Sequence, residues 1–181
     1  MARLHDAIDE TLRDWIAAQH VFFVATAPSG PDGHVNLSPK GYDTFRVLDD
    51  HTVAYLDLTG SGVETIAHLR DNGRITFMFC AFEGKPQILR LFGEGEAVLP
   101  ADPRFADLAA AFPTVPGVRA VVRCQVDRVQ TSCGFAVPFM DFRSERETLN
   151  DWAARKGPDG IDDYQLEKNA ASIDGLPGIG T

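Results

Sequence analysis

The stretch 56–62, Leu-Asp-Leu-Thr-Gly-Ser-Gly, leads from a predicted strand into a predicted helix through hydroxyl groups and glycines. The first amides of a helix have no partner inside the helix and carry partial positive charge, so such a junction can bind a phosphate group. The hydroxyl groups of Thr59 and Ser61, next to Gly62, would then contribute to the site. The alternative is that Ser61 only caps the helix, because Ser61 and Glu64 have the spacing of a capping box.

Polar side chains also alternate along the predicted strand 34–40. Asn36, Ser38 and Lys40 are two residues apart, so their side chains leave the strand on one face. If that face borders a groove, Lys40 can hold an anion or an electron-rich ring. The alternative is an ordinary strand whose polar face lies in solvent.

Arg90 is a single charge within the otherwise apolar stretch 88–92. A charge in apolar surroundings costs free energy unless it is paired. The sequence therefore predicts an anion beside Arg90, which is either a structural carboxylate or a bound ligand.

The remaining reactive residue types form no recognisable catalytic or metal site. The five histidines do not fall at a metal-binding or proton-relay spacing, and the sequence contains no Gly-x-Ser-x-Gly motif. Cys80 and Cys124 lie in strand-like runs and are predicted to be small buried residues. Cys133 is predicted to lie in a loop, either as a spectator thiol or as a reactive one. The sequence alone leaves the catalytic residues unknown and predicts no metal site.

The composition excludes several classes of protein. The chain has 181 residues, of which 44% are hydrophobic, which is typical of a folded domain that needs no disulfide or structural metal. Its 26 acidic and 17 basic residues give a net charge of -9, which disfavours nucleic acid as a partner. Acidic residues interrupt the stretch 1–19, and no apolar run reaches the roughly 20 residues that span a bilayer. We therefore expect no membrane association and a cytoplasmic location.

Hydrophobic periodicity and turn residues predict the elements that would position these side chains. Helices are predicted at 4–18, 61–72, 103–112, 146–156 and 162–170, and strands at 21–27, 34–40, 45–48, 52–58, 74–82, 87–99 and 118–131. The pair Asn72-Gly73 is a typical helix stop, and Gly93 and Gly95 indicate a bulge or a bend.

About seven strands, mostly joined as hairpins, favour a mainly β fold in which an antiparallel barrel carries peripheral helices. A doubly wound parallel sheet is disfavoured, because only the segment 54–79 offers a crossover from strand to helix to strand. We expect residues 1–181 to form a single domain, with an N-terminal helix within 1–20 and a helical C-terminal extension at 132–181.

Three stretches resemble the pyridoxamine 5'-phosphate oxidase-like family of flavin-binding split barrels: VNLSPKG at 35–41, VAYLDLTGSGVETIAHLRDNGRITFMF at 53–79 and ILRLFGEGEAV at 88–98. The resemblance implies an antiparallel split β-barrel that forms a homodimer and binds flavin mononucleotide (FMN) between its subunits. By this resemblance, Lys40 is similar to the strand lysine that approaches the flavin. Asp57 and Ser61 are similar to positions beside the flavin ring and its phosphate.

The chain also departs from the authentic oxidase. Gly62 and Val63 stand where the oxidase has Arg-Lys after its phosphate-binding serine, and Val35 stands where it has a strand arginine. Lys40 and Arg90 would then supply the positive charge, or a deazaflavin or haem, both used by relatives of this barrel, would occupy the groove. The Arg-x-His arrangement that reads pyridoxal substrates is absent, so true pyridoxamine phosphate oxidation is not expected.

The residues and the resemblance together predict an FMN-dependent oxidoreductase with an unknown small-molecule substrate. The predicted cofactor-binding residues are Ser38, Lys40, Asp57, Thr59, Ser61, Gly62 and Arg90. The alternatives are a non-catalytic flavin- or haem-binding protein, a deazaflavin-dependent reductase and a ligand-free dimerisation barrel. A split barrel leaves sheet edges and an apolar groove open, so we expect a homodimer in which the apolar residues of 135–142 face the partner.

Overall fold

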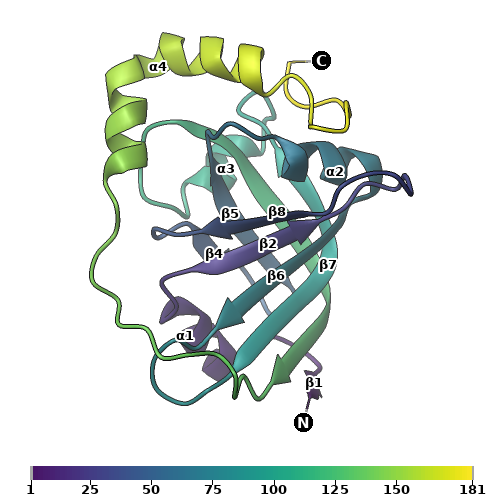
Figure 1. The fold of residues 1–181 in the computed structure, drawn as a ribbon, viewed down its shortest axis with the longest axis vertical. Helices are drawn as coiled ribbons and strands as arrows, with labels where there is room; N and C mark the ends of the chain where they lie inside the picture. The colour runs from purple at the N-terminus through teal and green to yellow at the C-terminus, as the bar shows by residue number, and fades with distance from the viewer. Residues whose placement is uncertain (1, 181) are drawn as a thin grey trace.

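Eight strands form one antiparallel sheet in the computed structural model, which describes residues 2–180 (Figure 1). The strands are β1 (Arg3–His5), β2 (Phe22–Thr26), β3 (Asn36–Lys40), β4 (Phe45–Val47), β5 (Thr52–Leu58), β6 (Arg74–Cys80), β7 (Ile88–Val98) and β8 (Val118–Ser132). Their order is β3-β2-β6-β7-β8-β5-β4, and β1 pairs with the C-terminal end of β8. Within the described residues, the edge strands β3 and β4 form no ladder with each other. The fold is therefore an antiparallel split barrel with peripheral helices, and the predicted fold class is confirmed.

Alternating side chains of the strands fill the interior of the barrel. In β2, Phe22 and Val24 are buried, whereas Phe23 between them is partly exposed. The largest interior side chains include Tyr55, Phe77, Phe79, Leu89 and Leu91. Lys40 lies opposite Phe22 in the ladder and Ser38 lies opposite Val24. Because directly paired residues point to the same side of a sheet, Lys40 and Ser38 point to the inner side of the barrel.

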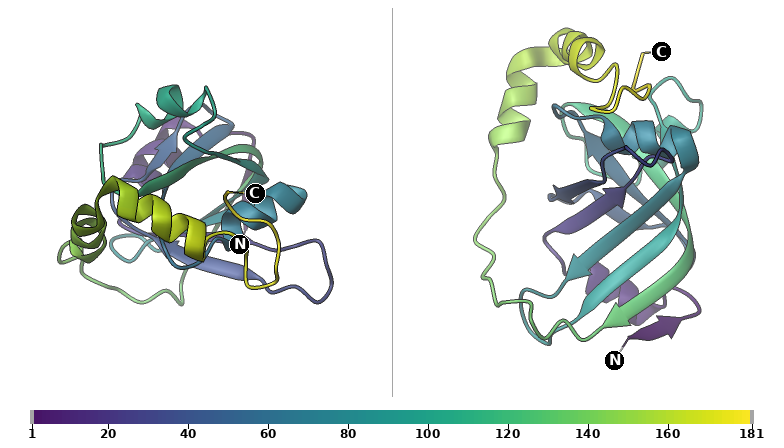
Figure 2. Two further views of the ribbon diagram at one scale, coloured as in Figure 1. Left: turned by 90° about the horizontal axis from the view of Figure 1, so that it is seen from above. Right: turned by 45° about the vertical axis from the view of Figure 1, so that its right-hand side comes forward.

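Four helices surround the barrel within residues 2–180: α1 (Glu10–Ala17), α2 (Glu64–Asn72), α3 (Phe105–Ala109) and α4 (Thr148–Lys168). Figure 2 shows α1 at one end of the barrel and α2 and α4 at the other end. α2 ends at Gly73, whose φ of 71° is left-handed, so the predicted Asn-Gly stop is confirmed. None of the helices in this part of the chain combines the length and the hydrophobicity that crossing a bilayer requires.

The C-terminal extension leaves the barrel after β8 and then returns to it. Residues 133–147, here called the strap, run along one side of the barrel to α4 (Figure 1). α4 joins the two predicted C-terminal helices across a bend at Gly157, whose φ is 69°. Residues 169–180, here called the tail, fold back onto the α2 end of the barrel, where Ile179 packs with Val63. The tail is thus part of the packed structure.

The helix predicted at 4–18 is too long at its start. Leu4 lies in β1, is 61% exposed and pairs with Gln130 of β8. α1 begins only after Asp9, whose side chain accepts a hydrogen bond from the Leu12 amide at 2.8 Å. The open edge of β8 offers backbone partners to the first residues, and such tertiary contacts override local helical periodicity.

The prediction that Ser61 caps α2 is wrong. Ser61 is exposed, α2 begins at Glu64, and no side chain caps its first amides. A helix that started at Ser61 would need the carbonyl group of Gly62 for its own hydrogen bonds. That carbonyl group instead accepts a hydrogen bond from Arg119 of β8 at 2.7 Å. A contact from a distant strand therefore delays the start of the helix.

The predicted irregularity at Gly93 is confirmed. The β7–β8 ladder shifts register between Phe92 and Gly93. A Cβ atom on Gly93 would clash with the carbonyl oxygen of Gln125 in β8. The bulge thus requires glycine because the two backbones approach closely there.

Candidate functional site

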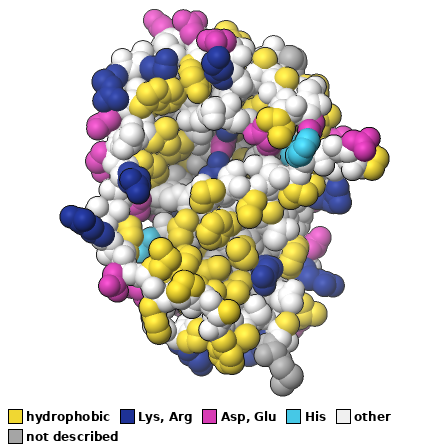
Figure 3. Space-filling model, in the orientation of Figure 1, with side chains coloured by type: hydrophobic (Ala, Val, Ile, Leu, Met, Phe, Trp, Pro, Cys, Tyr) yellow, Lys and Arg dark blue, Asp and Glu magenta, His cyan; other side chains and the backbone are white. Residues whose placement is uncertain are grey.

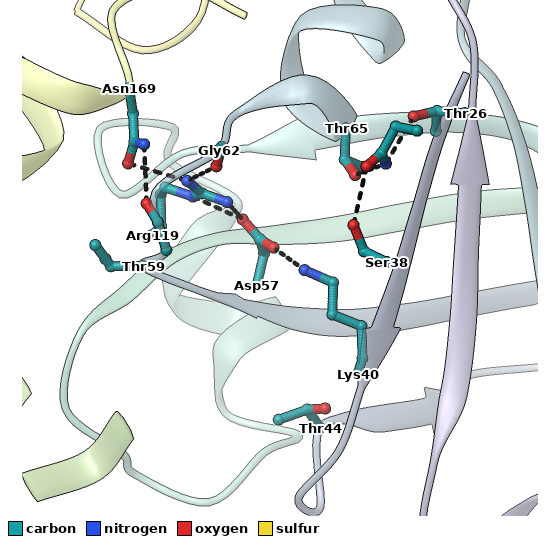
Figure 4. Close-up of polar contacts among 12 residues, drawn as sticks. Thr26, Ser38, Lys40, Thr44, Asp57, Thr59, Gly62, Thr65, Arg119 and Asn169 are labelled. Carbon is teal, nitrogen blue, oxygen red and sulfur yellow. Dashed lines mark hydrogen bonds and ion pairs between the residues drawn. The ribbon is translucent and has the colours of Figure 1, made fainter. Parts of the chain in front are cut away.

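A buried carboxylate lies between two basic side chains at the open edge of the barrel (Figure 4). Lys40 of β3 donates from Nζ to Asp57 Oδ1 of β5 at 3.1 Å. Arg119 of β8 contacts Asp57 Oδ2 through Nε and Nη2, each at 2.8 Å. The side chains of Asp57 and Arg119 are 0% and 4% exposed, whereas that of Lys40 is 22% exposed. These three residues, here called the ionic cluster, hold two positive charges against one negative charge.

A bulge turns Arg119 toward the carboxylate. Asp57 pairs with Ala120 in the β5–β8 ladder. The next residue of β5, Leu58, pairs with Val118, so Arg119 has no partner in β5. In a regular strand, Arg119 would point to the face opposite that of Ala120. The register shift re-aims the side chain, which is a common role of bulges beside functional sites.

Burial and charge act in opposite directions on the pKa of Asp57. Burial raises this pKa, because the carboxylate is removed from water. The charges and hydrogen bonds of Lys40 and Arg119 outweigh burial and hold the pKa below its ordinary value of 3.8. Asp57 is therefore ionised at neutral pH, and the ionic cluster carries a net positive charge.

A network of hydroxyl and amide groups lies beside the ionic cluster, on the same side of β3 (Figure 4). Ser38 Oγ donates to Asn36 Oδ1 at 2.9 Å, and Asn36 Nδ2 donates to the hydroxyl groups of Thr26 and Thr65 at 3.2 and 3.1 Å. Thr26 Oγ1 lies 3.0 Å from His68 Nδ1. His68 is fully buried, and burial lowers its pKa, so its ring is neutral at neutral pH. The network fixes the side chains of β3 against β2 and α2.

A cavity of about 290 Å³ lies between the ionic cluster and this network. It is lined by Asn36, Ser38, Pro39, Lys40, Leu58, Gly60, Gly62, Glu64, Thr65 and Arg119. Figure 3 shows a hollow in this face of the molecule with basic and acidic side chains at its floor. Ammonium, guanidinium and hydroxyl donors thus converge on one space, and the carboxylate of Glu64 forms part of its wall.

The tail supports this cavity from behind. Asn169 is fully buried, accepts a hydrogen bond from Arg119 Nη1 at 3.0 Å and donates to the carbonyl oxygen of Gly60 at 3.0 Å. Arg119 Nη1 also donates to the carbonyl oxygen of Gly62. The C-terminal extension therefore contacts Gly60 of the cavity wall and Arg119 of the ionic cluster directly, and Gly62 through Arg119.

The structure brings four of the seven predicted residues together. Ser38, Lys40 and Gly62 line the cavity, and Asp57 lies directly behind Lys40. Of the three residues that the resemblance singled out, Lys40 and Asp57 are in contact, whereas Ser61 lies apart from them.

Two other predicted residues have different roles. Thr59 uses its hydroxyl group within the fold, where it donates to the carbonyl oxygen of Gly117 at 2.8 Å and accepts from Gln165 of α4 at 2.7 Å. Ser61 is exposed and is not among the residues that line the cavity.

Arg90 lies apart from Lys40 in this chain. Its neighbours Leu89 and Leu91 are fully buried in the barrel, so the side chain of Arg90 leaves β7 on the outer face. Among residues 2–180 its hydrogen bond is to Ser132 Oγ, at 3.4 Å. The expectation that Lys40 and Arg90 jointly supply charge to one site is therefore not met within the chain.

Sequence reasoning missed Arg119 and Asn169. Arg119 precedes the buried run 120–122. An isolated charge in apolar surroundings costs free energy unless it is paired, and this argument, which singled out Arg90, applies equally to Arg119. Asn169 gave no signal in the sequence, because its role depends on how the tail returns to the barrel.

The cysteines are not among the residues that line the cavity. Cys80 and Cys124 are buried, as predicted, and burial raises the pKa of Cys124 to about 12. Cys133 is exposed, and a hydrogen bond from the backbone of Phe135 lowers its pKa. The described part of the chain contains no group of three or more His, Cys, Asp or Glu residues that could hold a metal ion.

A larger and mostly apolar cavity of about 850 Å³ lies between α1, the start of β2 and the strap. Its apolar lining residues are Trp15, Ala18, Val21, Phe23, Phe82, Met140 and Phe142. Phe142 of the strap stacks on His20 with ring centres 3.7 Å apart. The Met140 amide donates to the carbonyl oxygen of Phe82 at 3.0 Å. The strap therefore forms one wall of this second cavity.

The fold and the site define a class of protein: a split barrel with a basic cavity at its open edge. The family model described as "Pyridoxamine 5'-phosphate oxidase" matches residues 8–133, which include every strand from β2 to β8. The chain therefore belongs to the pyridoxamine 5'-phosphate oxidase family.

One relative is similar over nearly the whole chain, and two solved structures are similar over about two thirds of it. The pyridoxamine 5'-phosphate oxidase family protein ustO of Aspergillus flavus is 39% identical over 198 aligned residues, which cover 99% of this chain and 78% of the relative. A crystal structure of an H111A variant of HupZ from Group A Streptococcus is 26% identical with a TM-score of 0.55, covering 69% of this chain and 99% of that one. A structure from Lactobacillus delbrueckii is 18% identical with a TM-score of 0.53, covers 69% of this chain and 94% of that one, and shows the shared fold alone.

Proposed function

We propose that the chain is an FMN-dependent oxidoreductase that acts on a small-molecule substrate. The observation that carries the proposal is the net positive charge of the ionic cluster: Lys40 is partly exposed at the cavity, the buried Arg119 forms part of its wall, and Asp57 lies behind them. Membership of the pyridoxamine 5'-phosphate oxidase family supports redox chemistry. Charge-assisted hydrogen bonds from such donors suit an anionic or electron-rich polar ligand.

The residues of the cavity fit a polar part of a flavin. Lys40 offers a charged donor to its ring oxygens or its phosphate, and Ser38 and Thr65 offer hydroxyl groups. Arg119 adds positive charge at the cavity wall, while its own donors are bound to Asp57, Gly62 and Asn169. When bound, FMN would supply the hydride chemistry, while the protein would supply its position and its electrostatic surroundings. The carboxylate of Glu64 opposes a phosphate next to α2, so we expect any phosphate to lie on the Lys40 side of the cavity.

The first experiment is an absorption spectrum of the purified protein, followed by titration of the apo-protein with FMN and with riboflavin. We expect the bands of oxidised flavin, tighter binding of FMN than of riboflavin, and bleaching of the bound flavin by a nicotinamide donor. A Soret band or the spectrum of a deazaflavin would replace FMN with that cofactor. Bound flavin that no nicotinamide donor reduces and no acceptor reoxidises would show a carrier. A protein that binds none of these ligands would overturn the proposal.

We also propose that the strap contacts a second copy of the chain. Phe135 and Phe139 are 82% and 81% exposed, and Met140 is 58% exposed. Figure 3 shows that hydrophobic side chains gather over the lower half of the face shown. Exposed aromatic residues beside an apolar cavity are typical of an interaction surface, and a homodimer would cover them.

Light scattering at micromolar concentration tests the interface. We expect a dimer mass for the wild type and a monomer mass for a variant with Phe135→Ser and Phe139→Ser. Leu166→Ser, at an apolar position on α4 that is 62% exposed, is the control and should stay dimeric. A monomeric wild type would refute the proposed dimer, and a dimeric double variant would place its interface elsewhere.

A further inference from the structure

The amide group of Asn169 has only one possible orientation in the tail. The guanidinium group of Arg119 has only donors, and the carbonyl group of Gly60 only accepts. Asn169 Oδ1 must therefore face Arg119, and Nδ2 must face Gly60, each at 3.0 Å. Because Asn169 is fully buried, water does not replace either hydrogen bond.

These contacts also orient the loop that leads into α2. The carbonyl oxygen of Gly60 is bound by Asn169, and that of Gly62 is bound by the guanidinium group that Asn169 holds. In a trans peptide the N–H group points away from the carbonyl group, so the Ser61 amide points away from Asn169 and the Val63 amide points away from Arg119. Among residues 2–180 these two amides donate to no other group. The tail thus fixes the direction of the cavity-lining backbone.

We propose that Asn169 is a positioning residue of the cavity, which fixes Arg119 and thereby sets how Asp57 divides its charge between Arg119 and Lys40. The inference rests on the proposed flavin site for the identity of the ligand. Asn169 does not line the cavity itself, whereas Arg119 and Lys40 do. It acts on a ligand only through these two cations.

The way in which Asp57 divides its negative charge between Arg119 and Lys40 determines how strongly the ammonium group of Lys40 can bind a ligand. Asp57 gives Oδ1 to Lys40 and Oδ2 to Arg119. When Arg119 loses Asn169, its hold on Oδ2 weakens and the carboxylate pairs more closely with Lys40. The ammonium group of Lys40 is then more tightly engaged by Asp57 and less available to a ligand.

Titration with FMN compares Asn169→Ala with a control in the same tail. Ser172 is 7% exposed and accepts a hydrogen bond from the Leu176 amide at 3.1 Å, and it contacts neither Arg119 nor Gly60. We expect Asn169→Ala to weaken FMN binding at least about 10-fold, as for a lost hydrogen bond to a charged group, and Ser172→Ala to change it less than about twofold. Equal effects of the two variants overturn the proposal.

A near-isosteric variant separates positioning from folding. Asn169→Asp keeps an acceptor for Arg119 but loses the donor to Gly60, so we expect it to weaken FMN binding as well. The thermal midpoints of all variants are measured alongside. If Asn169→Ala does not fold, Asn169→Asp takes its place in the comparison with Ser172→Ala.

Acetylation of Lys40 at a fixed pH tests the same inference without any flavin. Because closer pairing with Asp57 shields the ammonium group, we expect Lys40 to be labelled more slowly in Asn169→Ala and at the wild-type rate in Ser172→Ala. A wild type that binds no flavin defeats the proposed function, but the labelling experiment still decides the role of Asn169. An unchanged labelling rate of Lys40 in the Asn169 variant overturns the inference.

Discussion

Asp57→Asn is the substitution that tests the ionic cluster most directly. The side chain of Asp57 is completely buried, and it receives one contact from Lys40 and two from Arg119. Asparagine has nearly the same shape, but it removes the charge and places an amide donor against one of the two cations. The guanidinium group of Arg119, which is 4% exposed, then stays buried without a counterion. Breaking a buried ion pair in this way costs about 3 to 5 kcal/mol, so we expect a loss of this size in the free energy of unfolding.

Urea denaturation measures this loss, with Asp43→Asn as the control. Asp43 also pairs with an arginine, Arg46, but its side chain is 70% exposed and screened by solvent, so its loss should cost less than about 1 kcal/mol.

The pKa of Asp57 is lowered in the folded state, so the stability that it contributes is complete above its ordinary value of 3.8 and is lost as the pH falls through the folded pKa. The difference in the free energy of unfolding between wild type and Asp57→Asn should therefore be constant near neutral pH and should disappear at acidic pH. A cost no larger than that of Asp43→Asn would refute our account of the cluster.

Three further predictions concern the site and the start and end of α2. Lys40→Ala should weaken FMN binding by about 10- to 150-fold and Arg90→Ala by much less, because Lys40 lines the cavity and Arg90 does not. Titration of the two apo-variants with FMN measures both losses, and equal losses would contradict the prediction. Ser61→Ala should change the free energy of unfolding by less than about 0.5 kcal/mol in urea denaturation, because Ser61 is exposed and caps nothing. Gly73→Ala should lower the free energy of unfolding by at least about 1 kcal/mol in the same assay, because φ at this residue is +71° and the new Cβ would lie 2.9 Å from Glu94 Cγ. No change in this free energy would show that the turn adapts to alanine.

Local sequence patterns were sufficient to predict the framework of the barrel. The strands of the hairpins and the stop at Gly73 follow from side-chain period and backbone preference, which act within a few residues. The same alternation put Ser38 and Lys40 on one face, and the structure places that face at a cavity. The resemblance added Asp57, which the structure places against Lys40.

The errors arise where a distant segment decides the outcome. The spacing of Ser61 and Glu64 is that of a capping box, but Arg119 takes the carbonyl group that the earlier helix start would need. Arg90 and Arg119 are both single charges within apolar stretches, 88–92 and 118–122, and the sequence gives no reason to prefer one of them. Their difference lies in barrel geometry: β7 is regular at Arg90, whereas the bulge in β8 at Arg119 turns the side chain toward Asp57.

The dependence of the cavity on Asn169 also has a consequence for the order of events during synthesis. Asp57 and Arg119 are 62 residues apart in the chain, and Arg119 and Asn169 are another 50 apart. The ribosome makes about 5 to 20 residues per second and releases the N-terminal part first, so all eight strands can pair seconds before Asn169 emerges. During that interval the barrel exists while its ligand cavity lacks a support. If the proposed function holds, we expect the cavity to bind its cofactor only after the tail has been made, so that the barrel forms before the cofactor binds.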